Sequence, residues 1–165
     1  MNLPSYKIGA YNFRPAVPHD GLLAEAWNDD DPDHDWEGEQ DGYWTEQDEH
    51  VNSYVLEDWI GIVFFLKMIR TGTDLEVSMQ FPPRNHTNFD IRTARAMSVG
   101  FEWLLRALTN NSIDRIFFSS RNQTVIDIAT KQWGFAKVDD DPISTAAGYS
   151  RFMCMLQTTA GSEAK

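Results

Sequence analysis

Short runs of alternating apolar and polar residues predict a sheet of many strands. The first run covers residues 7–16. Residues 53–69, rich in aromatic and β-branched side chains, predict one strand, a short turn and then a longer strand. Gly72 lies in a polar turn, and residues 75–81 predict the strand that returns from it. The central part of the chain therefore predicts three consecutive antiparallel strands.

Apolar residues at helical spacing predict helices on both sides of these strands. A short helix is expected over residues 19–27, with Asp20 as its N-cap. A longer helix is expected to follow the strand ending at residue 81, with Thr87 or Asn88 as its cap. Its apolar face consists of Ala94, Met97, Phe101, Leu104, Leu105 and Leu108.

The last third of the chain continues to alternate between strands and a helix. Residues 113–120 predict a strand, and Asn122 is placed to cap the helix that follows. Gly134 is expected to end this helix in a left-handed conformation. Residues 135–138 and 149–157 predict two final strands.

Composition favours one cytoplasmic domain. The 165 residues, 42% apolar, suit a domain over residues 1–157 with a disordered tail at 158–165. No run of 18 apolar residues is present, and residues 1–13 lack a signal-peptide pattern, so no membrane association is expected. The single cysteine, Cys154, excludes a disulfide framework and is expected to be a small core residue in a reducing compartment.

The net charge of −11 is concentrated in one part of the chain. Residues 15–66 contain 15 acidic residues and neither Lys nor Arg. Eleven of these acids lie in residues 28–50, which we interpret as an acidic insert in the domain. The insert is interpreted as a solvated loop or as a surface for a basic protein partner.

Other binding chemistries have little support. Asp33 begins a calcium-loop pattern, but the twelfth position is Trp44 where a bidentate Glu is needed. The four histidines lack metal-ligand spacing, so no metal site is expected. The aromatic residues of the insert are not interleaved with basic ones, which argues against nucleic-acid binding.

Four stretches, in this order, resemble the GNAT superfamily of acyl-CoA-dependent N-acetyltransferases. They read FRPAVPHD, WIGIVFFLKMI with LEVSMQFPPR, ARAMSVGFEWLLRAL, and IDRIFFSSRNQTVIDIATKQWGF. The resemblance implies the acyl-CoA N-acyltransferase fold, an α/β (α+β) domain whose mixed, mostly antiparallel central sheet is flanked by helices. It also implies transfer of an acetyl group from acetyl-CoA to a primary amine of a small molecule or peptide.

The resemblance also implies residues that hold the co-substrate. The pantetheine arm would bond to the main chain of Met79 and Phe81, and to Asn122. The start of the following helix would take the diphosphate through its N–H groups and nearby cations. That segment contains Arg84, Asn85, His86, Thr87 and Asn88. It lacks the glycines typical of the family, and Arg92 and Arg95 on the next turns add further cations.

For catalysis, the resemblance implies a general base on the strands before this helix. Glu76 and Glu57 are the candidates. The family's general acid is a Tyr in the last helix, but residues 129–132 contain none. The proton would then come from Ser119, Ser120 or water. Asn122 has a simpler interpretation, as a helix cap.

A second function fits the same resemblance. The absent glycines and Tyr are typical of a fold retained without catalysis, as a binding or structural protein. The chain also resembles short, divergent relatives encoded by bacteriophages. This implies, as the alternative, a virion or host-interaction protein.

Overall fold

The computed structural model describes residues 1, 3, 5–30, 41–83, 90–108, 111–138 and 148–156. The tail expected to be disordered, 158–165, lies outside this part of the chain. The strands are β1 (Tyr6–Ile8), β2 (Tyr11–Pro15), β3 (Val51–Glu57), β4 (Ile62–Thr71), β5 (Asp74–Gln80), β6 (Arg115–Ser120), β7 (Ala136–Lys137) and β8 (Ser150–Met155). The helices are α1 (Gly21–Asp29), α2 (Ile91–Leu108) and α3 (Gln123–Gln132), with 3-10 turns η1 (Pro18–Asp20) and η3 (Tyr43–Thr45).

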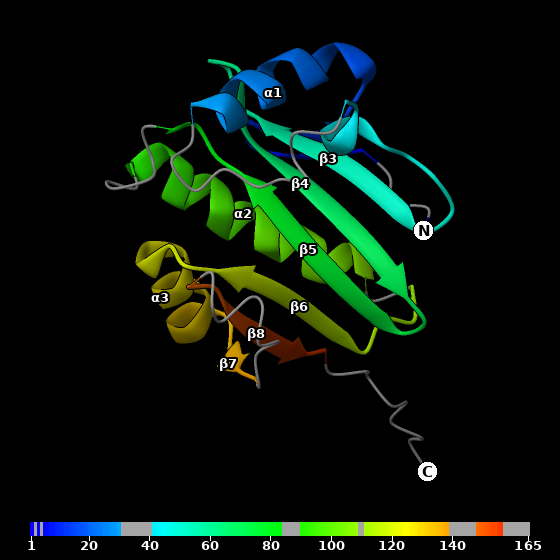
Figure 1. The fold of residues 1–165 in the computed structure, drawn as a ribbon, viewed down its shortest axis with the longest axis vertical. Coiled ribbons are helices and arrows are strands. Elements are labelled where there is room, and N and C mark those ends of the chain that lie inside the picture. The colour runs from blue at the N-terminus through cyan, green and yellow to red at the C-terminus, as the bar shows by residue number, and fades with distance from the viewer. Residues whose placement is uncertain are drawn as a thin grey trace.

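All eight strands form one mixed sheet in the order β1-β2-β3-β4-β5-β6-β8-β7. Every neighbouring pair is antiparallel except β5 and β6, which are parallel and are connected through α2. The predicted mostly antiparallel sheet with flanking helices is therefore confirmed (Figure 1).

Two local predictions at the N-terminus need correction. The run at 7–16 forms a hairpin, because the chain reverses at Gly9, whose φ of 55° is left-handed. Asp20 stands at the N-cap position of α1, but its side chain makes no cap bond to that helix. It accepts a 2.8 Å bond from the N–H of Val17 and pairs with Arg14 instead.

The strands bury different residues on the two faces of the sheet. In β4, Phe64 and Leu66 belong to the main core on the side of α2 and α3. Phe65 belongs to a smaller core, with Ala24 of α1 and Trp44 of η3, on the opposite face. Figure 1 shows α2 behind the central strands and α1 across their upper end. The sheet therefore has two distinct covered faces.

Helix α2 lies close against the sheet at Gly100. A Cβ added there would stand 3.0 Å from Cζ of Phe64 and 3.3 Å from Cζ of Phe13. Phe13 is itself stacked on Trp103 of α2, with ring centroids 4.6 Å apart. Within the described residues, no helix is long and apolar enough to cross a membrane.

Candidate functional site

The parallel strands β5 and β6 separate after three paired residues. Asp74, Leu75 and Glu76 oppose residues 115–117, and the paired register ends there. Residues 77–80 of β5 continue to pair with β4 on their other side. Beyond Glu76, β5 therefore has no partner residue in β6. Main-chain groups on that side must take their hydrogen bonds from a source other than this parallel ladder.

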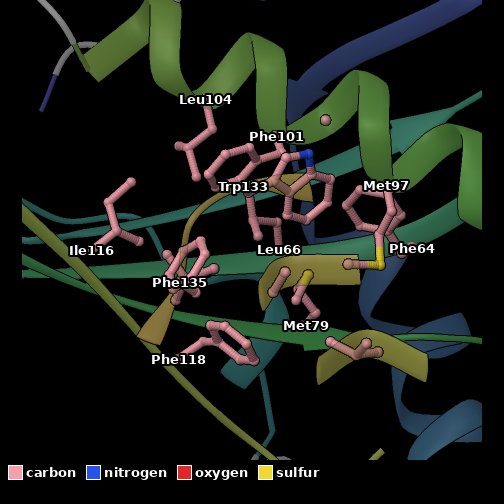
Figure 2. A pocket seen from close by; sticks show the side chains of 14 residues that line it. Phe64, Leu66, Met79, Met97, Phe101, Leu104, Ile116, Phe118, Trp133 and Phe135 are labelled. Carbon is pink, nitrogen blue, oxygen red and sulfur yellow. The ribbon is translucent and has the colours of Figure 1, made fainter. Parts of the chain in front are cut away.

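Behind this gap lies an apolar cavity of about 40 Å³. Figure 2 shows side chains of the sheet, α2 and the end of α3 converging on it. The lining comes from both separated strands, through Val77 and Met79 of β5 and Phe118 of β6. Of the described residues that line it, none carries a charge, an amide or a hydroxyl group. They are Phe64, Leu66, Val77, Met79, Met97, Gly100, Phe101, Leu104, Ile116, Phe118, Val125, Ala129, Trp133 and Phe135.

Aromatic contacts hold one wall of this cavity in place. The rings of Phe101 in α2 and Trp133 after α3 are stacked, with centroids 4.2 Å apart. Phe135 packs at 5.5 Å from Phe101 and 5.0 Å from Phe118. These contacts join the two helices over β6. Sequence analysis missed this wall, although Phe118 and Phe135 occupy core positions of predicted strands.

The start of α2 differs from the prediction. The helix begins at Ile91, and the Asp90 carboxylate accepts a 2.7 Å bond from the N–H of Thr93. Asp90 therefore caps the helix, and the expected caps Thr87 and Asn88 lie outside the described residues. Its negative charge lies at the helix end where a diphosphate was expected. A bound phosphate would have to share these N–H groups with Asp90 or displace it.

Arg92 is engaged in a structural ion pair. Its guanidinium donates two 2.6 Å hydrogen bonds to the Asp58 carboxylate and one of 3.2 Å to the Gly61 carbonyl. The pair lowers the pKa of Asp58 to about 2, mainly through the Arg92 bonds. Arg92 therefore links the turn between β3 and β4 to the start of α2 and is not available to a phosphate without breaking this link.

The structure places only some of the other residues that were predicted to hold the co-substrate. Arg95 is exposed on α2. Arg84, Asn85, His86, Thr87 and Asn88 lie outside the described residues. Met79 lines the cavity, and the Phe81 ring packs 5.6 Å from Phe64, so both side chains point to the face covered by α2 and α3.

The two candidate bases lie at opposite ends of β4. Glu57 opposes Ile62, whereas Glu76 opposes Ile69, seven residues further along the strand. Seven residues of strand span about 23 Å, so the two carboxylates cannot act on the same amine. Glu57 accepts bonds from Asn12 and Arg14 near the start of α1.

Glu76 lies where β5 and β6 begin to separate. It accepts a 2.7 Å bond from Arg151 of β8, and both side chains are more than one third exposed. The Arg151 guanidinium also lies 4.1 Å over the ring of Phe117. Glu76 is therefore accessible from the face opposite the cavity, but its charge is paired. Sequence analysis gave no sign of Arg151, which comes from a strand 75 residues away.

Asn122 caps α3, as the simpler interpretation predicted. Its Oδ1 accepts bonds from the N–H groups of Thr124 and Val125, at 3.0 and 3.3 Å. Within the family's Tyr segment, Ala129 lines the cavity and the Thr130 hydroxyl donates to the Ile126 carbonyl. Neither side chain can protonate a thiolate.

The described part of the acidic insert is anchored to the sheet. Lys67 of β4 is only 2% exposed. Its Nζ donates to the Tyr43 carbonyl at 3.0 Å and to Glu46 at 2.7 Å, and lies 3.6 Å over the Tyr43 ring. The segment around η3 is therefore a fixed cover of the α1 face. No cluster of metal-binding side chains occurs in the described residues.

Comparisons with known proteins place the fold. No family model matches the sequence, and no curated protein matches it. Among solved structures, the ribosomal-protein-S18-alanine N-acetyltransferase from Escherichia coli aligns with a TM-score of 0.67 at 13% identity, over 94% of this chain and 99% of that one. The spermidine/spermine N-acetyltransferase from Vibrio cholerae aligns at 0.63 and 12%, over 89% and 94%. This chain therefore has the GNAT acetyltransferase fold.

Proposed function

We propose that this protein is an N-acetyltransferase that transfers an acetyl group from acetyl-CoA to a primary amine. The observation that carries the proposal is the separation of β5 from β6 after Glu76. The main chain of β5 beyond Glu76, including Met79, and that of Phe81 just after the strand would supply donors and acceptors for the amides of the pantetheine arm. The apolar cavity behind it supplies space for the acyl end.

The remaining co-substrate contacts are assigned from the resemblance. Residues 84–88 and Arg95 would hold the diphosphate, with Asp90 displaced from the helix end. The Nδ2 group of Asn122 would donate to pantetheine, while its Oδ1 continues to cap α3. Co-substrate binding then leaves the fold of α3 unchanged.

Glu76 is the proposed general base. It lies at the separation point on the face opposite the cavity, so an amine approaching from that face reaches the thioester through the gap. The amine nitrogen attacks the thioester carbonyl, a C–N bond forms and the C–S bond breaks. Glu76 takes the ammonium proton directly or through water, and water returns one to the leaving thiolate.

The acceptor is proposed to be cationic. The acidic segment 28–50 begins at the end of α1, and its 11 acids would attract a polyamine, a lysine-rich peptide or an aminoglycoside. Two structurally similar enzymes act on spermidine/spermine and on an alanine of a ribosomal protein. Of these two kinds of acceptor, the polyamine fits the acidic segment better than the alanine does, because a polyamine carries several positive charges.

A second function is favoured by the start of α2. Asp90 and the Asp58–Arg92 pair occupy groups that a diphosphate would use. These contacts, with the absent Tyr, suit a GNAT-fold protein that binds a basic protein partner and has no catalytic activity. A bacteriophage protein of the virion or of host interaction belongs to this class.

Calorimetric titration with acetyl-CoA separates the two functions. An enzyme binds saturably, and at 100 times Kd the ligand stabilises the fold by about 2.7 kcal/mol. Glu76→Gln should then lower kcat at least about 100-fold with KM for acetyl-CoA unchanged. Asp74→Asn, a change to the neighbouring ion pair on β5, is the control and should leave kcat unchanged. Absence of acetyl-CoA binding would refute the enzymatic function.

A further inference from the structure

We propose that the donor site accepts acyl chains of up to about four carbons and binds butanoyl-CoA more tightly than acetyl-CoA. The inference rests on the proposed function, because it needs a CoA thioester in the gap between β5 and β6. It goes beyond that function by naming the acyl group.

The position of the cavity supports this proposal. Val77 and Met79 on one side and Phe118 on the other belong to the strand segments that no longer pair. A chain entering between the strands therefore reaches the cavity without crossing a helix. The polar thioester carbonyl would remain level with the open main chain of β5, and only the hydrocarbon part would enter.

The lining chemistry excludes most other occupants. A pantetheine amide or a charged group inside the cavity would lose its hydrogen bonds, because none of the described lining residues offers a polar side-chain group other than the indole of Trp133. Water is disfavoured for the same reason, since a buried water needs two to four polar partners. An aliphatic chain has no such requirement.

The volume sets the chain length. One water-sized position occupies on the order of 10–15 Å³, so a cavity of about 40 Å³ holds about three such positions. Butanoyl places three carbons beyond its carbonyl, whereas acetyl places one. The helices and the stacked pair Phe101–Trp133 close the far side, so an octanoyl chain would meet packed side chains.

The test is calorimetric titration with CoA, acetyl-CoA, butanoyl-CoA, hexanoyl-CoA and octanoyl-CoA. Each methylene that enters the cavity should tighten binding about fourfold, which predicts a butanoyl Kd about 15-fold below that of acetyl. Octanoyl-CoA should bind more weakly than butanoyl-CoA. If no CoA compound binds, the proposed function fails. If CoA binds but affinity is flat from acetyl to butanoyl, or rises through octanoyl, the cavity is a packing void and this inference fails.

Two opposite changes in α3 make the test specific to the cavity. Ala129→Val adds two carbons to the wall and should remove the butanoyl preference while CoA itself still binds. Val125→Ala removes two carbons and should shift the preference toward hexanoyl-CoA. Ala94→Val, in α2 and outside the lining, is the matched control and should keep the wild-type order. Thermal unfolding without ligand confirms that each variant is folded, and an unchanged order in both folded α3 variants would overturn the proposal.

Discussion

At the scale of single residues, several side chains with expected ligand roles instead hold the fold together. Arg92 joins α2 to the turn after β3 through Asp58, and Asn122 caps α3. Glu76 is at once a candidate base and the partner of Arg151. A charged residue near a predicted site is therefore weak evidence for binding until its partners in the fold are known.

The Asp58–Arg92 pair predicts acid sensitivity. Because the pKa of Asp58 is lowered from 3.8 to about 2, its stabilising effect is present above pH 3.8 and is lost as the pH falls toward 2. Asp58→Asn should lower the free energy of unfolding by about 1–2 kcal/mol at pH 7, and the difference from wild type should shrink as the pH falls from 3.8 and be lost only below the folded pKa of about 2.

Urea unfolding across this pH range measures the effect. Asp74→Asn, which removes the more exposed pair with Arg115, is the control and should cost less than about 0.5 kcal/mol. Equal losses of unfolding free energy in the two variants would show that the burial of Asp58 adds nothing to the stability that its ion pair provides.

The buried Lys67 makes a second prediction. Glu46 forms the direct ion pair with Lys67 at 2.7 Å, so Glu46→Ala leaves an ammonium group that is 2% exposed without this contact. We expect a loss of about 1–3 kcal/mol by thermal or urea unfolding. Glu49→Ala, an exposed acid nearby, should change stability by less than about 0.5 kcal/mol. If both substitutions lower the free energy of unfolding equally, the ion pair between Lys67 and Glu46 does not stabilise the fold.

At the scale of elements, α2 approaches the sheet closely at Gly100. Gly100 allows this approach, since any side chain there meets Phe13 and Phe64. Phe13 is stacked on Trp103, so moving its ring aside would disrupt that contact. The same close approach forms part of the cavity wall, because Gly100 and Phe64 both line the cavity.

Because of this packing, we expect valine to destabilise the fold more at Gly100 than at Ser98, another position of α2. Gly100→Val should destabilise the protein by about 1–3 kcal/mol more than Ser98→Val, because only the former overpacks the core. Both changes place the same β-branched residue inside the helix, so propensity does not explain a difference. Thermal unfolding of the two variants gives the answer, and similar melting temperatures would contradict the close approach.

At the scale of the whole molecule, the sheet has a weak internal junction. Strands β3 and β4 share seven paired positions, as do β4 and β5, whereas β5 and β6 share three. Two ion pairs, Arg115–Asp74 and Arg151–Glu76, cross this junction. The second half of the chain is therefore attached mainly through helix packing and these few contacts.

Amide hydrogen exchange should resolve the two halves. Amides of β3 and β4 should exchange only through global unfolding, while β6, β8 and α3 should exchange through a partial opening of lower free energy. Arg151→Ala should accelerate exchange in β6 and β8 and leave β3 and β4 unchanged. Uniform protection across the whole sheet would rule out this division.

The sequence predicted the order of the elements because local signals carry it. Alternation marked β5, Gly72 marked the hairpin, and Asn122 and Gly134 marked the ends of α3, where Gly134 has a φ of 72°. It failed at residues 7–16, since one glycine inside an alternating run does not by itself reveal a reversal. It did not single out Asp90 as a cap of α2, because Thr87, Asn88 and Asp90 are all residues that cap helices well and lie close together in the sequence.

By itself, then, the sequence determined the order of most strands and helices and the segments from which a site is built, and its resemblance to a known family implied the mixed sheet. Only the tertiary structure decided that β5 and β6 part after Glu76, that an apolar cavity lies behind the gap, and that Arg92 and Arg151 are already paired. The reason is physical. Hydrophobic periodicity and capping act within a few residues, whereas cavities and ion pairs depend on side chains brought together from distant strands.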